Sequence, residues 1–140
     1  MTETYDPDNI FAKILRGEIP SFKIYEDDDT YAFMDIMPRA DGHCLVIPKT
    51  SCRNMLDATP AQLTACLKTV QHLSHAVMRA FGATGVTIQQ FNEADGGQEV
   101  FHLHYHILPR HADVRLRPPG QMAEMDQLKA HADKIVDALE

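Results

Sequence analysis

The chain has 140 residues and a formal net charge of -7 at pH 7, and 44% of its residues are hydrophobic. This length predicts one domain, and the composition is that of a globular protein that needs neither disulfides nor a structural metal to build a core. The negative charge argues against a nucleic-acid duplex as partner, although a single nucleotide needs only a local phosphate-binding loop.

The cysteines and the N-terminus point to the cytoplasm. Cys44, Cys52 and Cys66 are odd in number and form no Cys-x-x-Cys pair, which favours free thiols in a reducing compartment. The acidic stretch MTETYDPDNI lacks the apolar run of a secretory signal, and no apolar run reaches membrane-spanning length. We therefore expect a soluble cytoplasmic protein with no membrane partner.

The first half of the chain predicts a short helix, a hairpin and a buried strand. The helix is expected over residues 10–16, with Asp8 as its cap and Gly17 at its end. The stretches FKIYED and TYAFMD are rich in β-forming residues and predict two strands joined by an acidic turn. After a loop that contains glycine, HCLVIP predicts a buried strand that ends at Pro48.

The second half predicts a long helix, two further strands and a C-terminal helix. Thr59 and Pro60 are typical of a helix start, and apolar residues at helical spacing continue to Phe81 before Gly82. Residues 85–91 and 100–109 predict strands, and an amphipathic helix is expected over about 121–139. Short links between most strands predict class α+β, with an antiparallel sheet and helices packed on one side.

The segment FHLHYHILPR places His102, His104 and His106 at alternate positions. Alternate side chains of a strand share one face, so the three imidazoles should line one surface while Leu103 and Tyr105 face the core. The exposed face of a half-buried strand usually carries Thr, Lys, Glu or Ser. The row of histidines therefore predicts chemistry.

A metal site is one interpretation of this row. Same-face residues on a strand are about 6.8 Å apart, so three rings on one straight strand can hardly converge on one ion with bonds of about 2.0–2.1 Å. A further ligand would be needed, for which His43 is a candidate, and no carboxylate is clearly placed to complete the shell. We therefore expect neither a metal nor another cofactor.

Nucleophilic and acid–base chemistry is the second interpretation. Neutral imidazole is a good nucleophile, and flanking imidazoles could fix its tautomer and bind a developing oxyanion. The preceding DGGQE supplies two glycines that allow backbone N–H groups to approach an anion, together with the side-chain amide of Gln98. The loop and the row together predict a phosphate-binding site.

Two segments resemble the histidine triad (HIT) family. GGQEVFHLHYHILPR resembles the family signature, His-φ-His-φ-His-φ-φ with φ apolar, and IFAKILRGEIPSFKIYEDDDTYAFMDIMPRADGHCLVIPK resembles the N-terminal half of family members. The likeness covers about residues 9–110 of a domain that spans 1–140. It implies a homodimer that hydrolyses or transfers at the α-phosphate of a purine nucleotide conjugate, such as a phosphoramidate or a dinucleoside polyphosphate, through a nucleotidyl-histidine.

The resemblance also implies roles for individual residues. His104 would attack phosphorus, while His102, His106 and His43 would orient it and bind phosphate. Asp35 would accept hydrogen bonds from the ribose hydroxyls. The remaining implied substrate-binding residues are Asn92, Gly97, Gln98 and Glu99 near the phosphate, and Phe11, Ile14, Ile19, Phe33 and Ile36 around the base.

The chain departs from the family pattern at two places. Some members carry a Cys-x-x-Cys that helps to bind zinc, where this chain has Asn9 and Ala12. Some eukaryotic members have Ser before the histidines, where this chain has Glu99, a carboxylate that is mildly unfavourable near an anionic substrate. Two other classes stay open as alternatives, a nucleotide-binding interaction module with little turnover and a histidine-rich metal enzyme.

Overall fold

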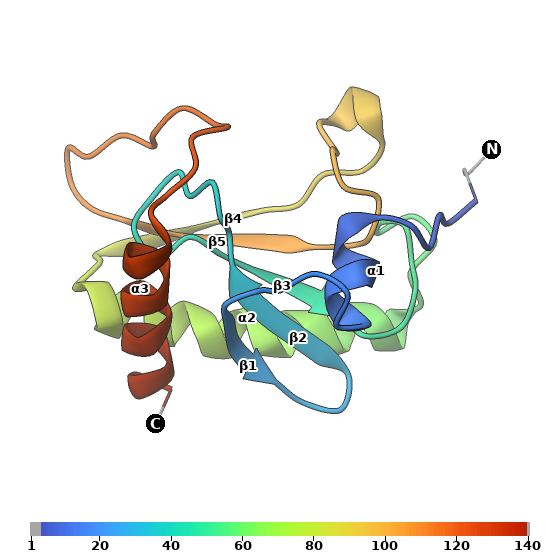
Figure 1. Ribbon diagram of the computed structural model, residues 1–140, viewed down its shortest axis with the longest axis horizontal. Helices are drawn as coiled ribbons and strands as arrows, with labels where there is room; N and C mark the ends of the chain where they lie inside the picture. Colours follow the sequence, from blue (N-terminus) through green and yellow to red (C-terminus); the bar gives the residue numbers. More distant parts are fainter. Residues whose placement is uncertain (1–3, 140) are drawn as a thin grey trace.

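The structure of the protein is a computed structural model, and it describes residues 4–139. Five strands form one antiparallel sheet in the order β1-β2-β3-β5-β4 (Figure 1). The strands are β1 (Lys23–Glu26), β2 (Thr30–Met34), β3 (Cys44–Pro48), β4 (Gly85–Gln89) and β5 (Tyr105–Arg110). The predicted α+β class and antiparallel sheet are therefore confirmed.

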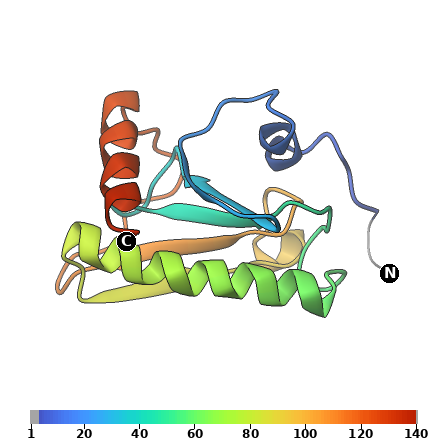
Figure 2. The same cartoon turned by 90° about the horizontal axis from the view of Figure 1, so that it is seen from below.

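The helices cover both faces of this sheet. They are α1 (Ile10–Leu15), α2 (Pro60–Phe81) and α3 (Met125–Asp137), with a short 3-10 helix η1 (Ala94–Gly96). Figure 2 shows α2 along one face and α1 on the other. Phe11 of α1 packs in a cluster with Phe33, Leu45 and Ile47. The prediction that all helices pack on one side is therefore wrong for α1, because alternate residues of β2 and β3 supply an apolar surface on the second face as well.

Local signals place most helix ends correctly. Thr59 and Gln62 form a reciprocal capping box at the start of α2, and Gly82 ends the helix in the left-handed conformation with φ of 59°. At α1 the cap is Asn9, whose side chain accepts an N–H of the first turn, and the expected cap Asp8 is wrong by one residue. Both side chains are good caps, so sequence alone does not separate them.

The C-terminal helix is shorter than the predicted span of 121–139. It starts at Met125, because the preceding residues run beside the loop that follows β2, where the Ala123 N–H donates to the Ile36 carbonyl over 3.0 Å. Met122 and Met125, at the start of the predicted span, are each 57% exposed. The buried residues of α3 are Leu128, Ala132 and Ile135.

The histidine segment is only partly a strand. The sequence predicts a strand over 100–109, whereas β5 begins at Tyr105. Before that point the chain leaves the ladder, since the Leu103 N–H donates to the Cys52 carbonyl at 2.9 Å and the ring of His102 contacts the Pro48 carbonyl. His102 and His104 thus precede the strand, so the alternation argument holds only from Tyr105 onward.

Between residues 4 and 139, the structure contains no helix that is both long and apolar enough to cross a membrane. The cytoplasmic location stays a prediction.

Gly42 lies in the loop between β2 and β3, where its backbone packs closely against the ring of Phe81. Its φ is +89°, and a Cβ at this position would lie 2.5 Å from Cε2 of Phe81. The Phe81 ring is itself held against His131, at 5.1 Å between centroids. We expect Gly42→Ala to lower the free energy of unfolding by about 1–3 kcal/mol, measured by urea denaturation.

Gly85→Ala is the matched control, because nothing lies within 4 Å of a Cβ at Gly85 and its φ is ordinary. If both variants change the free energy of unfolding equally, then Gly42 carries no special packing constraint.

Candidate active site

The candidate site lies on the face of the sheet that α1 covers. On β5, His106 pairs with Leu45 of β3 and with Gln89 of β4. Directly opposed residues of an antiparallel pair share a face, and Leu45 belongs to the cluster that includes Phe11 of α1. His43 immediately precedes β3, and its Nε2 lies 2.9 Å from Nδ1 of His106. Two imidazoles far apart in sequence therefore meet on this face.

The three histidines of the row are held in three different ways. The ring of His104 lies 5.1 Å from that of His106, edge to face, and its Nδ1 is 2.7 Å from the His102 carbonyl oxygen. The ring of His102 has Nε2 at 2.9 Å from the Pro48 carbonyl and Nδ1 at 2.7 Å from the hydroxyl of Tyr5. The three imidazoles are therefore not equivalent positions along a strand.

Backbone carbonyls fix the protons of the first two rings. A carbonyl oxygen only accepts, so His104 carries its proton on Nδ1 and donates it to the His102 carbonyl. His102 likewise donates from Nε2 to the Pro48 carbonyl and accepts from Tyr5 at Nδ1. In the neutral tautomer the lone pair of His104 is consequently on Nε2.

A backbone N–H fixes the protons of the second pair. The Arg39 N–H donates to Nδ1 of His43 at 3.0 Å, so neutral His43 carries its proton on Nε2. That proton is donated to Nδ1 of His106 over 2.9 Å. His106 therefore carries its own proton on Nε2. All four tautomers follow from the surrounding hydrogen bonds.

Burial lowers the pKa of all four imidazoles, because removal from water disfavours the charged form. The pKa of His43 and that of His102 fall to about 4, and the pKa of His106 falls to about 3, mainly through loss of hydration. The same cause lowers the pKa of His104, although its hydrogen bond to the His102 carbonyl opposes the shift. The rings are thus neutral near pH 7, as the assigned tautomers require.

Asp35 lies beside the second pair. Its Oδ2 is 3.4 Å from Nε2 of His43 and 3.9 Å from Nδ1 of His106, while Oδ1 accepts the N–H of Met37. The expected role of Asp35 at the ribose hydroxyls stays a proposal. The carboxylate does lie on the histidine side of the loop, with one oxygen beside the imidazoles.

These three side chains also have the spacing of a metal site. Their ligand atoms lie within 4.8 Å of one another, and ligand atoms around tetrahedral zinc are about 3.3 Å apart. A metal on Nε2 of His43 would require the proton to move to Nδ1, where the Arg39 N–H already points. The donor at that nitrogen therefore opposes metal binding by Asp35, His43 and His106, since a metal-bound histidine normally donates its other N–H to an acceptor.

The loop between β4 and β5 carries Gly97, and it contacts His106 through the ring of Phe91. The Phe91 ring lies 5.8 Å from the ring of His106, and a Cβ at Gly97 would be 3.1 Å from Cδ1 of Phe91. Gly97 also has a φ of +99°, so this position favours glycine on two counts. Asn92 accepts the Met55 N–H at 2.9 Å, which holds the start of the loop.

Gln98 does not present its side chain to a ligand. It is 4% exposed, and its Nε2 donates to the carbonyls of Arg53 and Val100. Its Oε1 accepts from the Asn54 amide and from the Glu93 N–H. The expectation that this amide donates to phosphate is wrong for the observed arrangement, because all its polar atoms are used inside the protein.

An ion pair closes the same network. Both Nε and Nη2 of Arg53 donate to the carboxylate of Glu93, at 2.8 and 2.9 Å, and the guanidinium lies 4.1 Å from the centroid of the Phe101 ring. Glu93 has a φ of +66°, which is uncommon for a residue other than glycine. The loop after β3 thus fixes the backbone from which Gly97 and Glu99 project. Glu99 is exposed, and its role stays a prediction.

The residues expected around the base fall into two groups. Phe11 contacts Phe33 at 5.4 Å and His104 at 4.9 Å between ring centroids, and Ile14 packs against the same cluster. Ile36, at 41% exposed, is open to solvent, and the half-buried Ile19 belongs to neither of the core clusters found among residues 4–139. The structure thus brings an aromatic pair to His104, and the roles of Ile19 and Ile36 at the base stay predictions.

Four residues of the site were missed by sequence reasoning. Tyr5 lies 97 positions from His102 and belongs to no pattern. Arg39 acts through a backbone N–H that any residue except proline supplies, so its identity gives no signal. Arg53 and Asn54 follow a strand as an ordinary polar pair, although Asn54 is fully buried.

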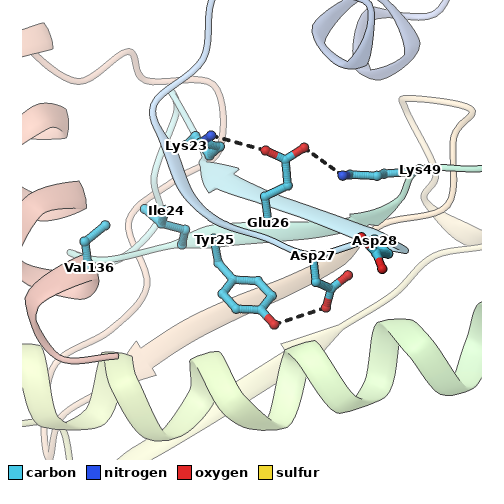
Figure 3. Close-up of a pocket in the computed structure, with 8 residues that line it drawn as sticks. All are labelled: Lys23, Ile24, Tyr25, Glu26, Asp27, Asp28, Lys49 and Val136. Atoms are coloured by element: carbon cyan, nitrogen blue, oxygen red, sulfur yellow. Dashed lines mark hydrogen bonds and ion pairs between the residues drawn. The ribbon is translucent and has the colours of Figure 1, made fainter. Parts of the chain in front are cut away.

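The hollow in Figure 3 is a different surface. It lies at β1, the edge of the sheet, and is lined by Lys23, Ile24, Tyr25, Glu26, Asp27, Asp28, Lys49 and Val136. Glu26 pairs with both Lys23 and Lys49, and Tyr25 donates to Asp27 (Figure 3). Its cations are therefore paired with its own acids, and none of the four histidines of the candidate site lines it.

Both a family match and a solved structure relate this chain to known proteins. Residues 16–113 match the HIT domain family. The chain belongs to this family, the class that the five-stranded sheet and the row of histidines define. A solved structure of a HIT-like protein involved in cell-cycle regulation, from Bartonella henselae, superposes with a TM-score of 0.94 at 51% identity, covering 97% of this chain and 99% of that chain.

Two characterised relatives carry names of enzymes. Adenosine 5'-monophosphoramidase HNT1 of Saccharomyces cerevisiae is 34% identical over 136 residues, which cover 94% of this chain and 84% of the relative. Adenylylsulfatase HINT3 of Arabidopsis thaliana is 37% identical over 78% of this chain. The match spans 55% of that longer relative.

The lowered pKa values predict how stability depends on pH. Unfolded imidazoles bind protons near pH 6.5, whereas folded His43, His102 and His106 stay neutral until about pH 3–4. Between these values the unfolded state binds more protons, so the free energy of unfolding rises with pH and is lost as pH falls from 6.5 to 4. Urea denaturation at several pH values measures this slope.

His106→Asn should make the slope shallower, because it removes one such group. The exposed His75→Asn on α2 is the matched control and should leave the slope unchanged. Equal slopes in the wild-type protein and His106→Asn would show that His106 is not neutral in the folded protein over this range.

Proposed function

We propose that the protein is a hydrolase or nucleotidyl transferase that acts at the α-phosphate of purine nucleotide conjugates through a covalent nucleotidyl-histidine. Family membership supports hydrolase chemistry on nucleotides, since relatives are named as an AMP phosphoramidase and an adenylylsulfatase. The substrate class proposed here is a phosphoramidate or a dinucleoside polyphosphate. No metal or other cofactor takes part.

The strongest support for His104 as the nucleophile is its tautomer. Its Nδ1 proton is donated to the His102 carbonyl over 2.7 Å, so the lone pair of the neutral ring is on Nε2. A neutral imidazole with a fixed tautomer is prepared to attack phosphorus without first losing a proton. The carbonyl then accepts a stronger hydrogen bond from the cationic ring that forms.

The proposed reaction has two steps. Nε2 of His104 forms a bond to the α-phosphorus while the bond to the leaving nitrogen or oxygen breaks, and the leaving group takes a proton from solvent as it departs. In the second step water attacks the same phosphorus, the phosphorus–Nε2 bond breaks and the nucleoside monophosphate is released. A proton returns to solvent, and the neutral ring is restored. His106, whose proton is on Nε2, is the neighbouring donor to phosphate oxygens, and His43 holds His106 in that tautomer.

Asp35 and the aromatic pair would bind the nucleoside part. The carboxylate would accept the ribose hydroxyls through Oδ2, and Phe11 with Phe33 would support the base, while Ile14, Ile19 and Ile36 are proposed around it. Asn92, Gly97 and Glu99 are proposed near the phosphate. For Gln98 we propose only the framework role that its buried amide supports.

Replacing the nucleophile separates the proposal from a binding module. We expect His104→Ala to reduce turnover of an adenylated amine about ten-thousandfold or more while the fold is retained, as loss of a nucleophile does elsewhere. His75→Ala, an exposed histidine on α2, is the control and should keep full turnover. The measurement is release of free amine under steady-state conditions.

Exhaustive chelation before the same assay separates the proposal from a metal enzyme. Activity should survive chelation in the wild-type protein. Near-native turnover by His104→Ala would contradict the role of His104, and activity that is lost on chelation and restored by zinc would favour the metal enzyme.

We also propose that the protein is a homodimer. Strand β4 ends the sheet, and Ile88 on it is 42% exposed. Leu67 on α2 is 53% exposed. An open strand edge beside exposed apolar side chains is typical of a surface that pairs with a second copy about a two-fold axis.

Light scattering at micromolar concentration should give the mass of a dimer. The double variant Leu67→Glu with Ile88→Glu should shift the mass toward a monomer. Val114→Glu, at a residue 58% exposed in the segment after β5, is the control and should leave the mass unchanged. A wild-type monomer would contradict the proposed dimer.

A further inference from the structure

Tyr5 contributes a hydrogen bond to the histidine row from outside the HIT signature. Its hydroxyl is 2.7 Å from Nδ1 of His102, and the two rings meet edge to face with centroids 5.7 Å apart. Tyr5 is half-buried, whereas His102 is 1% exposed. The contact therefore joins the N-terminal segment to the interior of the site.

The segment that carries Tyr5 is held in place by the two residues that flank α1, Asn9 and Arg16. The side chain of Asn9 donates to the Asp6 carbonyl at 2.7 Å, and Nη1 of Arg16 donates to the Pro7 carbonyl at 2.8 Å. Asn9 is also the cap of α1. These bonds hold the turn that carries Tyr5, and they thereby keep its hydroxyl beside His102.

The direction of each bond follows from its partners. His102 donates from Nε2 to the Pro48 carbonyl, so its Nδ1 is an acceptor and Tyr5 is the donor. The backbone carbonyl of His102 in turn accepts the Nδ1 proton of His104. His102 therefore connects the phenol of Tyr5 to the ring whose lone pair is proposed to attack phosphorus.

His102 lies outside the β ladder, so the hydrogen bonds of its ring help to hold it in place. Strand β5 begins three residues later, at Tyr105, and next to His102 the backbone is tied by the bond from the Leu103 N–H to the Cys52 carbonyl. Two side-chain hydrogen bonds, to Pro48 and from Tyr5, hold the ring itself. Loss of the bond from Tyr5 leaves the Pro48 carbonyl as the single hydrogen-bond partner of this ring among residues 4–139, and the carbonyl of the same residue orients His104.

We infer that Tyr5 is a positioning residue that acts through His102 to hold His104 in its reactive orientation. The inference rests on the proposed function of His104. Tyr5 itself touches His102, and it is assigned no contact with the reacting atoms. A tyrosine at this place completes a chain of three hydrogen bonds of 2.7, 2.9 and 2.7 Å around one residue.

Tyr5→Phe tests the inference because it removes only the hydroxyl. We expect kcat for an adenylated amine to fall roughly three- to tenfold, with KM unchanged, since one hydrogen bond of ordinary strength is lost away from the bound substrate. Tyr25→Phe is the matched control. Its hydroxyl donates to Asp27 at the hollow of Figure 3, and its loss should leave kcat unchanged.

Nitrogen-15 NMR of the imidazoles gives a second readout that needs no turnover. In Tyr5→Phe the Nδ1 signal of His102 should move toward that of a nitrogen without a hydrogen-bond donor. The Nδ1 proton of His104 should exchange with water faster than in the wild-type protein. Tyr25→Phe should match the wild-type protein in both signals.

The outcomes separate the inference from the proposed function. Unchanged exchange at His104 together with unchanged kcat would overturn the positioning role of Tyr5, even if the His102 signal moves. An unmoved His102 signal would overturn the hydrogen bond itself. A wild-type protein without turnover would refute the proposed function, and the exchange rate at His104 would still decide whether Tyr5 positions that ring.

Discussion

The hydrogen bond from Nδ1 of His104 to the His102 carbonyl is the interaction on which the site depends. It decides which nitrogen of His104 carries the lone pair, because a carbonyl cannot donate. The bond requires residue 102 to be held firmly, and three groups outside the signature do this, namely the Pro48 carbonyl, the hydroxyl of Tyr5 and the Cys52 carbonyl on the neighbouring residue. The chemistry of the row is thus fixed by the loop after β3 and by the N-terminal segment.

Burial and tautomer support one another in the remaining imidazoles. Loss of hydration lowers the pKa of His43 and His106, and neutral rings can then form the donor–acceptor pair that starts at the Arg39 N–H. The same N–H opposes a metal at the spacing shared with Asp35. A site of neutral, oriented imidazoles beside one carboxylate favours covalent attack on phosphorus over metal chemistry.

The sequence predicted those features that depend on neighbouring residues. The hairpin, the capping box at Thr59 and the left-handed end at Gly82 all arise from local chemistry, and the spacing of the histidines identified the site. Features set by distant contacts were not predicted. Strand β5 starts late because Leu103 and His102 form hydrogen bonds to the carbonyls of Cys52 and Pro48. The side chain of Gln98 forms hydrogen bonds within a network that joins two loops. Tyr5 gave no signal because its partner lies 97 residues away.

Mapping of the trapped intermediate shows whether His104 becomes covalently nucleotidylated. The protein would be mixed with an adenylated amine, quenched within milliseconds under conditions that preserve phosphorus–nitrogen bonds, digested and examined by mass spectrometry. The proposed mechanism predicts an adenylyl group on the peptide that contains residues 102–106, located at His104. A label at His102 or His106, or single-turnover release of amine without any labelled peptide, would contradict it.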